Sequence, residues 1–200
     1  MLETRDLDIR AALHTKKLCA YRAAPNTLVV DELGLSHAKV RIDIAVINGC
    51  VHGYEIKSSL DTLYRLPVQL GLYSQCLEKV TFVCAPQHVD GIAKLTPAWC
   101  GIIEAKKGER GAVSFKRLRR TGSNPGIDPV QLAHLLWRGE AATLLTSLNP
   151  DRTVKKRSRK ELYSELAAIM TVPQLTAAIR ESMQRRQTWR GPPTHALCGG

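Results

Sequence analysis

The stretch that decides the fold is residues 41–57, RIDIAVINGCVHGYEIK. Two runs of alternating apolar residues flank an Asn48-Gly49 pair. Asn-Gly between two such runs is the strongest short signal for a β-hairpin. The sequence therefore predicts a strand over 41–47, a tight turn, and a second strand over 51–57.

The charged side chains of this hairpin fix its register. A two-residue loop would place Asp43 opposite Tyr54 and put an acid on the apolar face. A three-residue loop over 48–50 pairs Asp43 with Glu55 and Ile44 with Tyr54. Only this second register keeps every charge on one face, so we predict a three-residue or bulged turn.

This register carries two further expectations about the faces of the hairpin. Successive side chains in a strand point to opposite faces. Ile42, Ile44 and Val46 should therefore share the apolar face, opposite the acids. The small residues Ala45 and Gly53 should lie beside the acids and leave room for a bulky group.

Helices and strands alternate along the rest of the chain, as judged from apolar periodicity and from Gly and Pro positions. The predicted elements are a helix over 4–22, a strand over 28–30, a helix over 59–77, a strand over 80–84, a helix over 87–95, strands over 99–104 and 112–116, and helices over 129–148, 160–170 and 173–187. The order indicates an α/β fold with a mixed central sheet flanked by helices, followed by a C-terminal helical appendage.

This layout leaves two alternatives for the start of one helix, and it suggests the domain boundaries. Proline inside a helix costs about 3 kcal/mol, so the helix over 59–77 either contains Pro67 or opens at it after a preceding turn. The domain prediction is a core over 1–126, a basic helical appendage over 127–190 and a disordered tail over 191–200.

The chain is basic. It has 29 Lys and Arg against 18 Asp and Glu, a formal net charge of +11, and its apolar fraction of 44% is ordinary for a protein with a packed core. Residues 151–190 contain ten Lys or Arg and four Asp or Glu, which is over half of the surplus. Such a surplus favours a polyanionic partner, chiefly nucleic acid. The alternative is a solvated surface that happens to be basic.

Location and redox state follow from what the sequence lacks. It has no apolar run long enough to span a bilayer, and the charged start MLETRDLDIR does not resemble a signal peptide. The six cysteines are scattered without a C-x-x-C pair, so we expect no disulfide framework. The sequence thus predicts a cytoplasmic protein with no membrane partner.

Asp43, Glu55 and Lys57 form the candidate chemical site. Phosphodiester hydrolysis needs a metal to polarise the phosphate and to lower the pKa of an attacking water, and Mg²⁺ prefers carboxylate oxygens. Two carboxylates on neighbouring strands could supply such a site, with the backbone carbonyl of Ile56 as a third ligand. Lys57 shares the face of Glu55 and could orient the nucleophile. The alternative is a surface acid pair and a lysine that form salt bridges.

These residues resemble the PD-(D/E)xK nuclease superfamily, and within it a small bacterial and phage group. The matching residues are Glu32-Leu33-Gly34, Arg41-Ile42-Asp43-Ile44-Ala45, Asn48, Gly53-Tyr54-Glu55-Ile56-Lys57-Ser58, Leu63 to Pro67, Gln69 and Tyr73. The resemblance implies a restriction-endonuclease-like core and a Mg²⁺ or Mn²⁺ ion on Asp43 and Glu55. It also implies a catalytic Lys57.

An acid further upstream usually completes the metal site of that superfamily. Glu32 is the candidate here, and Asp31, Asp8 and Glu3 are the alternatives. The spacing from Gln69 to Tyr73 resembles the glutamine–tyrosine motif of RecB-like nucleases, and both side chains would share one helix face.

Three further residues are candidates for substrate binding. Arg41 and Arg65 could contact phosphates, or they could form salt bridges with the acids. Ser58 could place a phosphate, although capping of the next helix is the better explanation.

The sequence therefore predicts a Mg²⁺-dependent deoxyribonuclease. The alternative is a non-catalytic DNA-binding or regulatory protein on the same fold, including a component of a phage or phage-defence system that a partner activates. A homodimer or a neighbour-encoded partner protein is left open.

Overall fold

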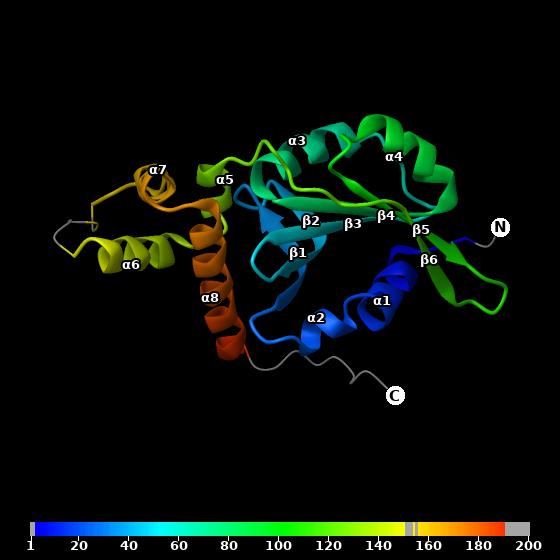
Figure 1. Ribbon diagram of the computed structural model, residues 1–200, viewed down its shortest axis with the longest axis horizontal. Coiled ribbons are helices and arrows are strands. Elements are labelled where there is room, and N and C mark those ends of the chain that lie inside the picture. The colour runs from blue at the N-terminus through cyan, green and yellow to red at the C-terminus, as the bar shows by residue number, and fades with distance from the viewer. Residues whose placement is uncertain (1–2, 151–153, 155, 191–200) are drawn as a thin grey trace.

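A mixed sheet of six strands forms the centre of the protein (Figure 1). The structure is a computed structural model, and it describes residues 3–150, 154 and 156–190. The strands are β1 (Leu28–Leu35), β2 (Val40–Ile47), β3 (Val51–Lys57), β4 (Lys79–Cys84), β5 (Gly101–Lys107) and β6 (Val113–Arg119), in that spatial order. The β3–β4 and β4–β5 pairs are parallel, and the other three pairs are antiparallel.

Helices cover both faces of this sheet. The helices of the core are α1 (Asp6–Lys16), α2 (Cys19–Ala23), α3 (Leu66–Cys76) and α4 (Val89–Leu95), with a 3₁₀ turn η1 (Pro86–His88) before α4. In Figure 1, α3 and α4 lie above the sheet and α1 and α2 lie below it. Each face has its own buried apolar cluster. The prediction of an α/β fold with a mixed sheet flanked by helices is therefore confirmed.

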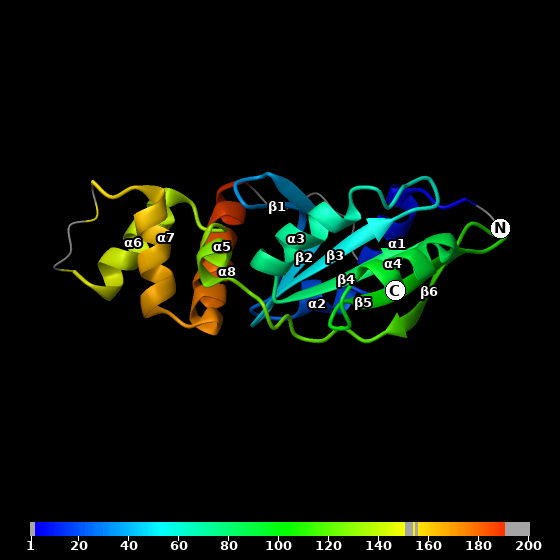
Figure 2. The ribbon, with the colours of Figure 1, turned by 90° about the horizontal axis from the view of Figure 1, so that it is seen from above.

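Four further helices form the C-terminal appendage, beside the β1 edge of the sheet (Figure 2). They are α5 (Pro129–Ala133), α6 (Arg138–Leu148), α7 (Arg159–Ile169) and α8 (Val172–Arg190). The cluster under α3 continues into the appendage through Leu132, Tyr163 and Ile179, so the appendage shares one core with the sheet. The boundary at residue 126 stays a prediction, and the predicted tail over 191–200 lies outside the described residues.

The hairpin has the predicted register. Ile44 pairs with Tyr54 and Ile47 with Val51, so residues 48–50 form a three-residue loop. Gly49 has a φ of 105°, a conformation that favours glycine. The pattern of charged residues thus indicates the correct one of the two registers.

The alternation of faces is not continuous along β1 and β2, however. Ala45 packs in the cluster under α3, and Ile42 packs there too although it lies an odd number of residues away. Val30 and Leu33 show the same change on β1. The predicted sharing of one face by Ile42 and Ile44 is therefore wrong.

The change of face occurs where Glu32 and Asp43 lie opposite each other between the two paired segments. Glu32 has a φ of 53°, in the left-handed region that non-glycine residues rarely adopt. The Asp43 carboxylate accepts a hydrogen bond from the backbone N–H of Ile56, at 2.6 Å. In a regular ladder this N–H would bond to a backbone carbonyl of the neighbouring strand. Side-chain contacts with the neighbouring strand and helix therefore override the local alternation.

Gly53 does not leave room for a bulky group, contrary to the prediction. A Cβ atom at this position would lie 2.6 Å from Leu77 Cδ1 and 2.9 Å from Ile42 Cγ1. The space beside the glycine is filled by these two apolar side chains. Glycine is needed here because the strand packs closely against α3 and the displaced Ile42.

Several predicted boundaries differ from the structure, and the single helix predicted over 4–22 is the two helices α1 and α2. β1 continues through Leu35 because the hairpin pairing with β2 extends to Val40. The helix predicted over 59–77 begins only at Leu66, with Pro67 in its first turn, which was the second alternative. The single helix predicted over 129–148 is two helices, since Trp137 has an extended backbone and donates its N–H to Glu140 at 2.7 Å.

None of the described helices is both long and apolar enough to cross a membrane. Four cysteines are free thiols: Cys50, Cys76, Cys84 and Cys100. The last three are buried, and burial raises the pKa of Cys84 and of Cys100 to about 12. These thiols are small core residues rather than reactive ones.

Substitution of Gly53 by alanine is expected to lower the free energy of unfolding by about 1–3 kcal/mol, since the added methyl group overlaps packed side chains. Gly71→Ala in α3 is the matched control. Its Cβ would meet no atom within 4 Å, and alanine favours a helix by about 0.5–1 kcal/mol. Urea denaturation of both variants measures the difference. An equal response at the two sites would contradict the packing assigned to Gly53.

Candidate functional site

Glu55 is the centre of a buried hydrogen-bond network. Its side chain lies on β3 and the residue is 3% exposed. One carboxylate oxygen, Oε1, accepts from Lys57 Nζ at 2.8 Å and from Gln69 Nε2 at 3.1 Å. The other, Oε2, accepts from the Tyr73 hydroxyl at 2.7 Å. We refer to Glu55, Lys57, Gln69 and Tyr73 as the Glu55 network.

The chain builds this network from two neighbouring elements. Glu55 and Lys57 share a face of β3 because they are two residues apart, and Gln69 and Tyr73 share a face of α3 because they are four apart. Lys57 also donates to Gln69 Oε1 at 3.2 Å and is only 8% exposed. The structure thus brings together four of the predicted site residues.

The Tyr73 hydroxyl of the network stays protonated. Burial raises the pKa of Tyr73 far above its usual value, and the Glu55 carboxylate raises it further. The phenol therefore stays protonated, and its hydroxyl donates a hydrogen bond to Glu55. A buried carboxylate is stable only when such donors replace the lost water.

Arg10 on α1 forms a second network around Asp43. Its Nη2 lies 3.0 Å from Asp43 Oδ1 and 2.7 Å from Glu32 Oε1, and its Nη1 donates to the Asp43 carbonyl oxygen at 2.8 Å. Asp6, one helical turn before Arg10, holds the guanidinium at 3.0 Å. We refer to Asp6, Arg10, Glu32 and Asp43 as the Arg10 network.

Neither Arg10 nor Asp6 is among the site residues predicted from the sequence. Their four-residue spacing is a local signal for a helix ion pair, but it does not indicate which strand the arginine faces. Among the four upstream acids considered, Glu32 is the one that joins Asp43. Asp31 pairs instead with His14 at 2.8 Å, and Asp8 pairs with Lys107 at 2.8 Å.

The donor set of the two networks does not fit Mg²⁺ or Mn²⁺. All four carboxylate oxygens of Asp43 and Glu55 accept hydrogen bonds from protein donors, and Arg10 occupies the position of a counter-ion between Asp43 and Glu32. Within the described ranges, no group of three or more His, Cys, Asp or Glu side chains could hold a metal ion. The metal ligands assigned to Asp43, Glu55, Glu32 and the Ile56 carbonyl remain predictions.

A basic groove of about 540 Å³ lies beside the Glu55 network. Lys39, Arg41 and Arg65 supply its positive charge, and Gln69 connects it to the network. In the described part of the chain, neither Arg41 nor Arg65 takes part in a salt bridge. The arginine–acid pairing considered as an alternative is therefore not found, and both side chains can contact a ligand.

Ser58 lies outside this groove. It is buried, and its hydroxyl donates to Asp61 Oδ2 at 2.6 Å while its N–H donates to the same oxygen at 2.8 Å. The serine closes the turn that follows β3, several residues before α3 begins. The structure thus supports a local turn role for Ser58, which does not lie at the start of α3.

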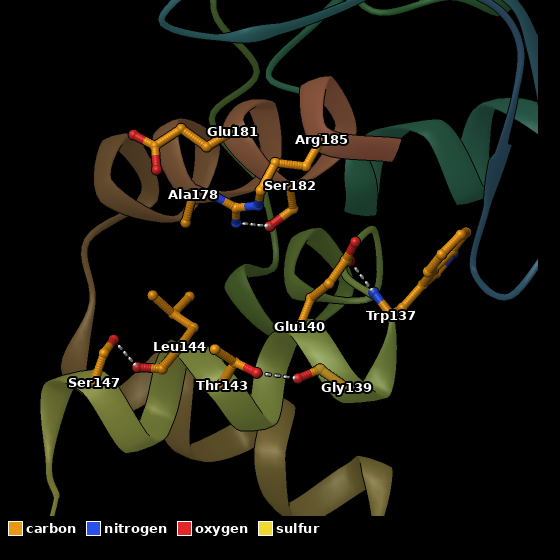
Figure 3. Close-up of a pocket in the computed structure, with 10 residues that line it drawn as sticks. All are labelled: Trp137, Gly139, Glu140, Thr143, Leu144, Ser147, Ala178, Glu181, Ser182 and Arg185. Carbon is orange, nitrogen blue, oxygen red and sulfur yellow. Dashed lines mark hydrogen bonds between the residues drawn. The ribbon is translucent and has the colours of Figure 1, made fainter. Parts of the chain in front are cut away.

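A larger cavity of about 600 Å³ separates α6 from α8 in the appendage (Figure 3). Several of its polar side chains are bonded to residues close by along the chain, and Glu140 also binds Arg186 of α8. Thr143 donates to Gly139, Ser147 donates to Leu144, and Glu140 accepts from Trp137. Since its hydroxyl groups are satisfied locally, this cavity presents less binding chemistry than the basic groove.

The fold and the site define a basic α/β protein with a buried acid–lysine network next to a basic groove. The chain belongs to the family of bacteriophage P4 protein cII, whose model matches residues 4–190. It is 33% identical to protein cII of Enterobacteria phage P4 over 158 residues, which is 79% of this chain. The match spans 59% of that relative's length. No solved structure matches the chain at a significant level.

These comparisons correct the prediction of an enzyme. The family and the relative are both described as phage P4 protein cII, and neither description is that of a nuclease or of any other enzyme. The prediction of a Mg²⁺-dependent deoxyribonuclease is therefore wrong. The phage part of the resemblance is confirmed, whereas neither comparison supports membership of the PD-(D/E)xK superfamily.

Loss of the Tyr73 hydroxyl is expected to destabilise the protein. Tyr73→Phe leaves Glu55 Oε2 buried without its donor and should lower the free energy of unfolding by about 1–3 kcal/mol. Tyr64→Phe removes the same hydroxyl from a fully solvated ring and should change it by less than about 0.5 kcal/mol. Chemical denaturation at one pH compares the two variants. Equal stabilities would show that the Tyr73 bond contributes nothing.

Stability should also depend on the ionisation of Asp43. Burial and the nearby Glu55 carboxylate raise the pKa of Asp43 to about 7, against the lowering effects of the Ile56 N–H and Arg10. The folded protein therefore keeps a proton that the unfolded chain loses near pH 4. The free energy of unfolding should fall as pH rises from about 4 to 7, by up to about 4 kcal/mol, since one pKa unit corresponds to about 1.4 kcal/mol.

Denaturation of wild type and of Asp43→Asn at several pH values between 4 and 8 measures this dependence. The amide cannot ionise, so the variant should show a flatter profile across the window. Asp90→Asn, at an exposed position in α4, is the control and should follow the wild-type profile. Parallel profiles for wild type and Asp43→Asn would contradict the raised pKa.

Proposed function

We propose that the protein is a non-catalytic DNA-binding regulatory protein on a PD-(D/E)xK-like fold. The observation that carries this proposal is the basic groove, defined by Lys39, Arg41 and Arg65. It lies beside the Glu55 network, in which the Glu55 carboxylate and the Lys57 amine are both hydrogen-bonded within the protein. The family membership supports a phage protein. The closed hydrogen bonding of Glu55 and Lys57 supports a structural role for the residues that resemble a catalytic site.

The charges of the groove favour a polyanion. Glu32 is the one acid among the lining residues, and Arg10 neutralises it at 2.7 Å. The groove lining therefore has three basic side chains, Lys39, Arg41 and Arg65, against this one acid. Guanidinium groups bind phosphate oxygens in pairs, which suits the repeating phosphates of a DNA backbone.

The rim of the groove adds apolar surface beside these charges. Tyr64 is 91% exposed and directly precedes Arg65, and Val68 at the groove is 71% exposed. An exposed aromatic ring beside arginines is a surface on which a base or a sugar can pack. The net charge of +11 supplies long-range attraction to the same partner.

The Glu55 network positions this surface. It joins the end of β3 to α3, which supplies Gln69 to the groove, and Arg65 directly precedes α3. Lys57 serves as a buried counter-ion for Glu55. On this proposal the acids and the lysine stabilise the binding surface rather than cut the ligand.

Removal of the two groove arginines should weaken DNA binding and reduce its salt dependence. Each lost phosphate contact lowers the slope of log K against log salt by about 0.9, so Arg41→Ala/Arg65→Ala should reduce it by about 1.8. Fluorescence anisotropy with labelled duplex DNA at several salt concentrations measures the slope. Lys116→Ala/Arg117→Ala removes two exposed charges from β6 and should leave most of the salt slope unchanged.

Two outcomes of this experiment would overturn the proposal. One is an equal loss of slope in the groove variant and in the β6 variant, which would leave only diffuse attraction. The other is Mg²⁺-dependent cleavage of the DNA by the wild type that Lys57→Ala abolishes. Gel analysis of the same samples after incubation with Mg²⁺ tests this second point.

A further inference from the structure

A second basic pocket lies on the other side of the turn that joins β1 to β2. It encloses about 360 Å³ and is separated from the basic groove by that turn, with Ala38 lining both. We refer to it as the junction pocket, since its walls come from the turn and from the appendage. Its side chains with a ring or a charge are His37, His134, Trp137, Arg138, Arg159, Tyr163 and Arg186.

The lining of the junction pocket combines positive charge with flat rings. It contains three arginines and two histidines, and no aspartate or glutamate. The His37 and His134 rings lie 4.4 Å apart between centroids, and the His134 and Tyr163 rings 4.7 Å apart. A planar ligand with a negative group could pack on the rings and pair with the guanidinium groups.

Not every positive side chain of the junction pocket is paired with an acid of the protein. Glu140 binds Arg186, whose guanidinium also lies over the Trp137 ring at 4.2 Å. Arg159, in the first turn of α7, forms no salt bridge within the described part of the chain. His134 Nδ1 is buried and has no hydrogen-bond partner among the described residues. An anion in the pocket would supply that partner.

The turn holds His37 in the pocket at an unfavourable backbone conformation. Ser36, His37 and Ala38 have φ values of 47°, 60° and 64°, although none of them is glycine. The Ser36 hydroxyl anchors the turn, donating to Gln131 Oε1 at 3.3 Å. Consecutive left-handed residues persist only where the surroundings fix them, and such strain gathers at binding sites.

We propose that the junction pocket binds a terminal nucleotide, that is, a phosphate monoester next to a planar base. The phosphate would lie between Arg159 and the histidines, and the base would pack on the His134 and Tyr163 rings. A volume of 360 Å³ is in the range of small-molecule sites. The ligand is a free nucleotide or the 5′-phosphorylated end of a DNA strand, which share this chemistry. The site is separate from the groove assigned to DNA binding.

Calorimetric titration of the full chain with deoxyadenosine monophosphate, deoxyadenosine and inorganic phosphate tests the site. We expect saturable binding of the nucleotide, at least about tenfold tighter than of the nucleoside or of phosphate alone. Two oligonucleotides that differ only in a 5′-phosphate distinguish the sources. A phosphate-dependent gain identifies a DNA end, and binding of the mononucleotide without that gain identifies a free nucleotide.

His37→Gly is the decisive variant because it separates binding from folding. Glycine tolerates the left-handed conformation, so thermal stability should be kept or raised while nucleotide affinity falls about tenfold. Arg159→Ala, at an exposed position, should have the same effect on affinity. Lys39→Ala is the matched control, since Lys39 lies two residues from His37 and lines the basic groove instead.

Three results would overturn the assignment: no saturable binding of the mononucleotide, equal affinity for the mononucleotide and inorganic phosphate, or unchanged affinity in His37→Gly. Failure here is distinguishable from failure of the proposed function. Arg41→Ala/Arg65→Ala should bind the mononucleotide as the wild type does, and His37→Gly should keep the salt slope of duplex binding.

Discussion

The burial of one carboxylate, that of Glu55, determines how the sheet and α3 meet. A charge taken out of water is stable only when close donors replace its hydration. Lys57, Gln69 and Tyr73 are those donors, and two of them belong to α3. The helix must therefore lie where its glutamine and tyrosine reach the end of β3. That position also places Arg65 beside Arg41 and so creates the basic groove.

The second constraint is the change of face on β1 and β2. Arg10 bridges Glu32 and Asp43, and beyond these residues the apolar side chains of both strands turn to the cluster under α3. The end of the β1–β2 pair that carries its connecting turn thereby joins the core of the appendage. Its turn then separates the basic groove from the junction pocket. One local irregularity thus connects the sheet, the appendage and both basic surfaces.

The candidate site shows why an acid–acid–lysine pattern does not by itself indicate cleavage. The sequence correctly brings Asp43, Glu55, Lys57, Gln69 and Tyr73 into one region, since strand and helix periodicities place them there. It does not show that the carboxylates are satisfied by protein donors, because Arg10 comes from a helix 33 residues before Asp43. The family of phage P4 protein cII then corrects the predicted enzyme. The same residues can stabilise a surface instead of binding a metal.

The sequence by itself determined the features that depend on near neighbours. These are the order of the main strands and helices, the three-residue loop between β2 and β3, and the basic charge, whereas Pro67 left two alternatives for the start of α3. Only the tertiary structure decided the face of Ile42, the length of β1, the break at Trp137 and the partners of Asp43. Turn chemistry and periodicity act over a few residues, so they can be read along the chain. The choice of partner for a buried charge depends on which distant elements pack together, and no local pattern contains that information.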